Sequence, residues 1–388
     1  MKLPDGWKEV KLGDIAKISS GSTPARNKSS YWNGNIPWVK TTQIQNCHIT
    51  KDSIDEYITQ EGFENSSLTM IPKGTILMAM YGQGRTRGQL GILDIDATTN
   101  QACAAIKNDK TTDTDFLYQL LLYHYEDIRN LSNVGGQQNL SGEIIRTIDL
   151  KMPPLPEQKA IADTLSVWDC MIEKTEKLID EKEKNYSCFM EKVFSVKGKK
   201  EQVLVKKFAQ EVSVRNSSLS VTQVLSVTNK NGFVLPEEQF SKHVASNDLS
   251  NYKVVKKRQF AYNPSRINVG SIARLDNWDN AVLSPMYTVF EIKEGMVNSD
   301  YFFHWLHSHR ANQKIKTCAQ GGVRAIVNFS DFASISLYVP EKRKQDEIAD
   351  VLNSMQKEIT LLRQLAEQYK LQKQGLMQKL LTGQWRME

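Results

Sequence analysis

The chain contains one long helical block twice, and this repeat limits what it can fold into. The block PPLPEQKAIADTL in the middle of the sequence returns as PEKRKQDEIADVL near its end. The matching Ile-Ala-Asp triplets start at Ile161 and Ile348, which are 187 residues apart, and the same offset relates Pro153 to Pro340. Upstream, VGGQQNLSGEIIRTIDLKMP is loosely similar to QGGVRAIVNFSDFASISLYVP. Such a repeat predicts two related halves, each a variable globular block followed by a helix.

Each repeated block has the periodicity of a coiled coil, because its core positions recur at alternating spacings of four and three residues. Prolines precede both blocks, and Gly383 is a natural end for the second helix. A helix with a single apolar stripe is not stable alone, so we predict that the two helices pack against each other. The alternative, in which each helix packs only on its own domain, fits the long polar faces less well. The predicted seam consists of Ile161, Leu165, Trp168, Ile172, Ile179, Ile348, Leu352, Met355, Ile359 and Leu362.

The variable blocks predict a mixed α/β (α+β) fold. KGTILMAM, QACAAIK, RTIDLKMP and ASISLYVP have the pattern of strands, whereas DTDFLYQLLLYHYEDIRNL and SDYFFHWLHSHRANQKI have the apolar stripes of helices. We therefore divide the chain into a globular domain at 1–152, a helix at 153–197, a second globular domain at 198–339 and a second helix at 340–388.

Composition narrows the class of protein. The 50 basic and 44 acidic residues give a net charge of +6, which permits nucleic-acid binding without requiring it. The N-terminal sequence has no secretory signal, and no run approaches the roughly 18 apolar residues of a membrane helix, so we expect a cytoplasmic protein. The five cysteines form no C-x-x-C pair, and neither a disulfide framework nor a metal site is predicted. His304, His307 and His309 lie in an aromatic helical pattern that favours a packing or surface role over metal binding.

A search for catalytic patterns yields none that passes a structural test. MYGQGRTRG at 80–88 is one residue longer than the dinucleotide fingerprint, and a strand pattern follows it where a helix should begin. NPSR at Asn263 lacks the second proline and the aromatic residue of amino-group methyltransferases. Asp5, Glu9 and Lys11 are too close together for a nuclease core. We predict no catalytic residues, so the chain itself is not expected to be an enzyme.

Glycine-rich loops with arginine occur in both halves, as GQGRTRG and AYNPSRINVGS. Glycine lets a backbone come close to a partner. Arginine matches phosphate or guanine, and glutamine or asparagine matches adenine. One such loop could be an ordinary surface turn, but its recurrence in both halves favours nucleic-acid binding.

The whole chain resembles the DNA-specificity subunits of type I restriction-modification systems. The resemblance is carried by WKEVKLGDIAKISSGSTP with IPWVKTTQI, by GGQQNLSGEIIRTIDLKMPPLPEQKAIADTL, and by VPEKRKQDEIADVL with LMQKLLTGQWR. It implies that each variable block is a target recognition domain, which reads one half of a split DNA sequence. It also implies an antiparallel coil of the two helices that docks two methyltransferase (modification) subunits. Those partners carry S-adenosylmethionine, and two restriction subunits that use ATP and magnesium can join, so no cofactor or metal is expected in this chain.

With this resemblance, the polar loops become the candidate DNA-binding sites. Phosphate contacts should outnumber base contacts, so most of these residues should position the duplex. The candidates are Lys40, Thr41, Gln43, Gln83, Arg85, Arg87, Gln137, Gln138, Asn263, Ser265, Arg266, Asn268 and Arg324.

Three other functions remain open from the sequence. A stand-alone DNA-binding regulator would bind DNA tightly without a partner, and an enzyme that uses the glycine loop would bind a nucleotide by itself. A pure coiled-coil scaffold would show no salt-dependent DNA binding.

The coil also predicts a geometric effect on the target. If the helices set the distance between two reading domains, shortening the first helix by one heptad should change the spacer of the recognised sequence. A map of modified adenines in cells that express the shortened chain with its methyltransferase measures this spacer. An unchanged spacer would contradict the role of the helix as a ruler.

Overall fold

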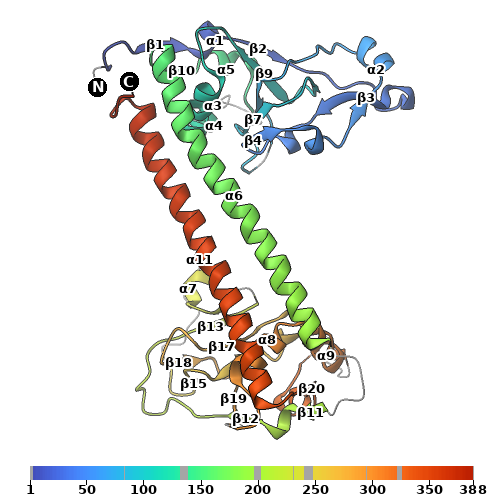
Figure 1. Cartoon of the computed structure of the whole chain (residues 1–388), viewed down its shortest axis with the longest axis vertical. Coiled ribbons are helices and arrows are strands. Elements are labelled where there is room, and N and C mark those ends of the chain that lie inside the picture. The colour runs from blue at the N-terminus through green and yellow to red at the C-terminus, as the bar shows by residue number, and fades with distance from the viewer. Residues whose placement is uncertain are drawn as a thin grey trace. The chain divides into compact units, whose positions relative to one another are not determined.

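The computed structural model describes residues 3–82, 84–131, 139–195, 202–229, 231–239, 248–293, 295–320 and 326–387. They form two compact units, one made of Met1–Thr175 with Leu365–Glu388 and the other of Glu176–Gln364. Each unit contains one globular domain and part of both long helices, α6 (Leu155–Phe194) and α11 (Lys342–Leu381), coloured green and red in Figure 1. Within the described ranges, no helix is both long and apolar enough to cross a membrane.

The predicted seam between the two helices is confirmed in each unit. Every position of the four-three pattern, from residue 161 to 193 and from 348 to 380, is buried or half-buried. In the first unit, Ile161 packs in one core with Leu380, and Trp168 meets Tyr369 edge-on with ring centroids 5.9 Å apart. Residue numbers that rise along α6 thus meet numbers that fall along α11, so the helices are antiparallel there.

A five-stranded sheet forms the centre of the N-terminal domain. Its strands alternate their side chains between two cores, as strand geometry requires. Ile76 and Met78 of the central strand face α6, whereas Leu77 and Ala79 face the other way. The strands in order across the sheet are β2 (Ala16–Ser20), β9 (Cys103–Asn108), β6 (Ile76–Ala79), β7 (Leu90–Leu93) and β4 (Cys47–Ile49), antiparallel except for the parallel pair β4–β7.

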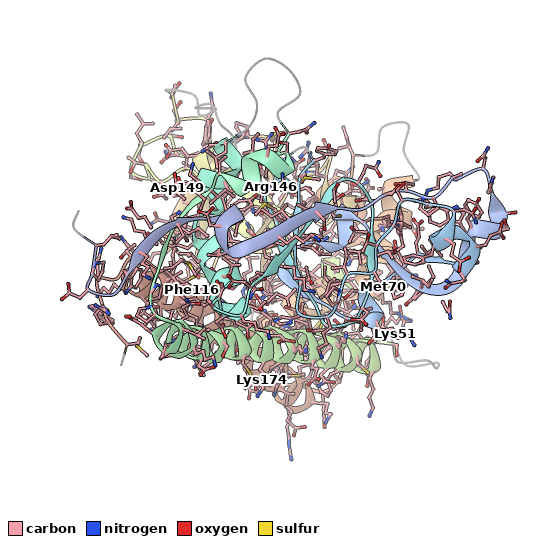
Figure 2. All side chains as sticks on the ribbon, turned by 90° about the horizontal axis from the view of Figure 1, so that it is seen from above. Lys51, Met70, Phe116, Arg146, Asp149 and Lys174 are labelled. Carbon is pink, nitrogen blue, oxygen red and sulfur yellow. The ribbon has the colours of Figure 1, made fainter. Side chains whose placement is uncertain are left out.

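Other elements cover both faces of this sheet. One face packs against α3, whose Phe116 lies between the domain and α6 in Figure 2, on the side away from Arg146 and Asp149. The other face packs against a small sheet of β5 (Tyr57–Ile58), β3 (Trp32–Val39) and β8 (Thr98–Thr99). The remaining elements of the domain are the pair β1 (Lys8–Lys11) and β10 (Asp149–Met152), and the helices α1 (Leu12–Ile15), α2 (Gln60–Glu64), α3 (Thr114–Tyr123), α4 (Tyr125–Asn130) and α5 (Gly142–Arg146).

The C-terminal domain repeats this plan. Its main sheet runs β12 (Ala209–Val212), β19 (Thr288–Ile292), β16 (Phe260–Tyr262) and β17 (Ile272–Arg274), which is the order of β2, β9, β6 and β7 in the first domain. Phe260 and Tyr262 face the long helices, and Ala261 faces a second core. The other elements are the strand pairs β11 (Gln202–Leu204) with β20 (Ser336–Tyr338), β13 (Ser226–Thr228) with β14 (Gly232–Val234) and β15 (Lys253–Lys256) with β18 (Asn280–Leu283), and the helices α7 (Pro236–Gln239), α8 (Ser299–Leu306), α9 (His309–Gln320) and α10 (Phe329–Ala333).

The four strands predicted from sequence are confirmed as β6, β9, β10 and β20. Each of the two predicted domain helices is instead a pair of helices, α3 with α4 and α8 with α9. The second break has a local cause, because the Ser308 hydroxyl accepts a hydrogen bond from the Ala311 backbone amide and so caps a new helix. Of the packing and surface roles that the sequence left open for His304, the structure shows packing, since this residue is 1% exposed.

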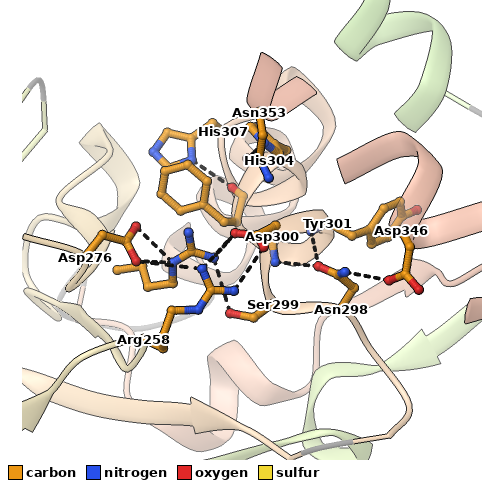
Figure 3. A network of polar contacts seen from close by, with 12 residues as sticks. Arg258, Asp276, Asn298, Ser299, Asp300, Tyr301, His304, His307, Asp346 and Asn353 are labelled. Carbon is orange, nitrogen blue, oxygen red and sulfur yellow. Dashed lines mark hydrogen bonds and ion pairs between the residues drawn. The ribbon is translucent and has the colours of Figure 1, made fainter. Parts of the chain in front are cut away.

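Polar contacts fix each domain to both long helices. In the first unit, Asp169 of α6 binds Gln119 of α3 and Lys373 of α11, at 2.7 and 2.6 Å. In the second unit, His304 of α8 lies 2.9 Å from the Tyr186 hydroxyl of α6 and 2.8 Å from the Asn353 amide oxygen of α11. In the same unit, Arg258 forms two hydrogen bonds to Asp300, and Asn298 donates one to Asp346 of α11 (Figure 3). Buried polar groups tolerate few arrangements, so these contacts fix the position of each domain helix.

Glu157, at the start of α6, connects the C-terminal tail of the chain to Trp7 in the same unit. The carboxylate of Glu157, whose side chain is 5% exposed, accepts two hydrogen bonds from Arg386 and one from the Trp7 indole. Burial alone would raise the pKa of Glu157, but these donors outweigh it and lower that pKa.

We expect Arg386→Ala to lower the melting temperature by a few degrees, because Glu157 would lose its cationic partner. A group with a lowered pKa in the folded state contributes stability above its unfolded pKa and loses it as the pH falls. The difference between wild type and variant should therefore shrink as the pH is lowered from 7 to about 4. The control is Arg343→Ala, since Arg343 is 87% exposed and pairs with Glu347 of its own helix. A difference independent of pH would contradict the proposed role of the ion pair.

Candidate nucleic-acid interface

The two glycine- and arginine-bearing loops connect equivalent strands of the two domains. Residues 80–89 join β6 to β7, and residues 263–271 join β16 to β17. Both strand pairs are antiparallel neighbours in sheets of the same order. The strand predicted to follow the first loop is confirmed as β7, and no helix begins in the described residues of that loop. We call these segments the first and second hairpin loops.

The first hairpin loop is held by its backbone. Gly84 and Gly88 have φ angles of 67° and 85°, which glycine adopts without strain. From α4, the Arg129 guanidinium donates to the Gly84 carbonyl, and the Tyr125 hydroxyl donates to the Arg85 carbonyl. Since these contacts use the carbonyl groups, the side chain of Arg85 stays exposed, while Arg87 is half-buried.

The second hairpin loop closes on itself. The Asn263 side-chain oxygen accepts from the Ser265 amide at 3.0 Å, and the Arg266 carbonyl accepts from the Ser271 amide at 3.1 Å. Ile267 is 1% exposed and anchors the loop in the same core as α9. Arg266 and Ser265 are exposed, and Asn268 is half-buried. The loop thus presents polar groups from a fixed backbone.

A hollow of about 410 Å³ lies beside the second hairpin loop, and we call it the C-terminal hollow. Asn263 and Arg266 line it together with the strand β13 and the segment before β19. Sequence reasoning missed its lining residues Ser284 and Met286, because no pattern distinguishes them from ordinary strand and turn residues.

Two of the candidates in the segment after β3, Lys40 and Gln43, have their polar groups engaged within the domain. Lys40 lies 2.6 Å from Glu56 and 2.9 Å from Asp55, and Gln43 also donates to Asp55. The hydrogen bond to Glu56 is the main cause of a raised pKa at Lys40. DNA contacts by Lys40, Thr41 and Gln43 stay a prediction, and for Lys40 they would have to compete with two carboxylates.

Four candidates, Gln83, Gln137, Gln138 and Arg324, lie outside the described residues. The described residues that follow Gln138 and Arg324 occupy equivalent places in the two domains. The Leu140 amide donates to the Met80 carbonyl at the start of the first hairpin loop, and the Val327 amide donates to the Pro264 carbonyl in the second. Leu140 and Val327 are themselves separated by the repeat offset of 187 residues.

The described residues contain no group of three or more His, Cys, Asp or Glu side chains that could hold a metal ion. The candidate surface instead offers arginines, amides and hydroxyls on anchored loops. These groups bind phosphates and base edges by hydrogen bonds and charge.

Comparison with known proteins identifies the family. The family model described as "Type I restriction modification DNA specificity domain" matches residues 4–184 and 228–370. The chain therefore belongs to this family, as its sequence resemblance predicted.

Relatives and solved structures agree with this assignment. The chain is 30% identical to the type I restriction enzyme MjaIX specificity subunit of Methanocaldococcus jannaschii over 45% of its own length and 41% of the relative. It is 22% identical to the MjaVIII specificity subunit of the same organism over 100% of its length and 95% of the relative. Its fold is similar to that of a type I restriction-modification S subunit from M. genitalium, with a TM-score of 0.63, 14% identity and 98% of both chains covered.

The anchoring of the first hairpin loop can be tested with trypsin. Tyr125→Phe removes the hydroxyl that binds the Arg85 carbonyl, so cleavage after Arg85 should become several-fold faster under native conditions, because backbone opening limits proteolysis. Mass spectrometry of the early fragments measures the rate at this bond. Tyr123→Phe on the adjacent helix is the control and should leave the rate unchanged. Equal rates in wild type and Tyr125→Phe would mean that this contact does not hold the loop.

Proposed function

We propose that this chain is the specificity subunit of a type I restriction-modification complex and reads a bipartite DNA target. The observation that carries this proposal is that the chain has two domains in which equivalent hairpin loops join equivalent strands. A protein with two such domains suits a target with two separated halves, one for each domain. Membership of the family supports the same function.

In this proposal the chain binds DNA and leaves the chemistry to its partners. Methylation of adenine with S-adenosylmethionine, and restriction with ATP and magnesium, belong to the methyltransferase and restriction subunits. The loops supply hydrogen-bond donors and positive charge, which position a duplex without reacting with it. A complex that acts on cellular DNA places the chain in the cytoplasm.

The outer faces of the long helices support docking of methyltransferase subunits. Away from the seam, the helices leave several apolar side chains exposed to solvent. Single exposed apolar residues are common, but several on the same two helices favour a protein partner. They are Val167 and Leu178 on α6, and Val351, Leu361, Leu365 and Leu371 on α11. We assign two methyltransferase subunits to these faces, because the repeat gives the chain two related halves.

The experiment that tests this function is a map of methylated bases in cells that express the chain with its methyltransferase. We expect methyladenine in one bipartite motif that is present only with this chain. If the complex assembles but no new methylation appears, the proposal fails. Tight and specific DNA binding by the chain alone would then favour a stand-alone regulator.

With the target known, single substitutions test the two loops. We expect Arg85→Ala and Arg266→Ala each to weaken binding of the assembled complex by about tenfold and to reduce the salt dependence by about one ion. Melting temperatures should not change, because both side chains are exposed. Arg343→Ala, at an exposed arginine outside the loops, is the matched control. Unchanged affinity in both loop variants would move the DNA contacts elsewhere.

A further inference from the structure

The charge and the exposed side chains of the C-terminal hollow indicate which chemical group of DNA it would contact. The inference rests on the proposed function and deepens it. Among the described residues that line this hollow, Arg266 is the one charged side chain, and none is a carboxylate. The other polar groups around it are hydroxyls and amides, including those of Thr228, Asn229 and Asn263. This electrostatic character suits an anionic ligand that also offers hydrogen bonds.

Two apolar side chains lie exposed at the same hollow. Val269, in the second hairpin loop, is 60% exposed, and Met286, just before β19, is 56% exposed. One exposed apolar residue needs no explanation. Two of them beside an exposed arginine, at the edge of a polar hollow, form a mixed surface of the kind that contacts base edges.

Both side chains stand on fixed backbone. The loop that carries Val269 is bound to β13 by the hydrogen bond from the Ser271 hydroxyl to the Val227 carbonyl, at 2.8 Å. Next to Met286, the carbonyl of Tyr287 accepts a 2.7 Å hydrogen bond from Lys253. A reading surface needs such support, because ordering a loose loop would consume binding free energy.

In the major groove of B-DNA, the apolar group that a base presents is the C5-methyl of thymine. We propose that Val269 and Met286 contact thymine methyl groups in the half-target read by the C-terminal domain, with Arg266 bound to the same stretch of DNA. The stiff valine fixes one contact, and the flexible methionine adapts to the other. These two residues thereby determine part of the sequence specificity.

The test removes one methyl group at a time from the DNA. In duplexes that carry the mapped target, each thymine is replaced singly by deoxyuridine, and affinity for the assembled complex is measured. Wild-type protein should lose about threefold to tenfold at one or two thymines of a single half-target, the loss expected for one buried methyl group. Met286→Ala and Val269→Ala should bind the thymine duplex more weakly and lose their sensitivity to deoxyuridine at those positions.

Met296→Ala is the matched control, because Met296 is 50% exposed in the same domain and does not line the hollow. It should keep the full response to deoxyuridine. An unchanged affinity of the wild type at every thymine replacement, or an unchanged response of both Val269→Ala and Met286→Ala, would overturn this inference. Each of these results leaves the proposed function intact, whereas a missing methylation motif would defeat the function itself. The measurement with wild-type protein changes only the DNA, so it tests the inference even if the variants do not fold.

Discussion

The antiparallel contact between α6 and α11 is the interaction on which the rest of the structure depends. Neither helix has a second apolar stripe that could stabilise it alone, so each requires the other. Each domain core is then completed by seam residues. Ile161 and Leu165 pack with Phe116 in the first unit, and Leu352 packs with Phe302 in the second. The domains and the coil therefore share their hydrophobic cores, and Asp169 and His304 add polar contacts that fix the domain helices on the coil.

The seam was predictable from sequence, because a four-three spacing reports directly on which residues are buried. The repeat offset also predicted two related domains, and in the structure the main sheets of both domains have the same strand order. The helix breaks at His124 and His307 were not predictable from the apolar stripe, which continues across them. The second break occurs because the Ser308 hydroxyl caps α9. A single serine within a helical pattern is too weak a sequence signal to predict such a cap.

The candidate site was predictable as loops and not as individual residues. Glycine and arginine marked both hairpin loops, but spacing alone could not reveal that Tyr125 and Arg129 hold the first loop by its carbonyl groups. Lys40 illustrates the opposite difficulty. Its residue type suggested a phosphate contact, yet Asp55 and Glu56, 15 and 16 residues further along the chain, bind it in the folded domain. Val269 and Met286 are apolar, so their residue types did not suggest a DNA contact. Only their exposed positions at the C-terminal hollow do so.

The ion pairs between the helices have a consequence for how copies of the chain meet. Two helical blocks with the same seam pattern could pair like with like between molecules. In the second unit, Glu183 of α6 binds Arg363 of α11. Shifted by the repeat offset of 187 residues, a pairing of two α6 helices would set Glu183 against Glu176, and a pairing of two α11 helices would set Arg363 against Lys370. Both contacts are repulsive. The repeat thus supplies the common seam, and the charges that differ between its two copies favour a self-contained molecule over pairing with its neighbours.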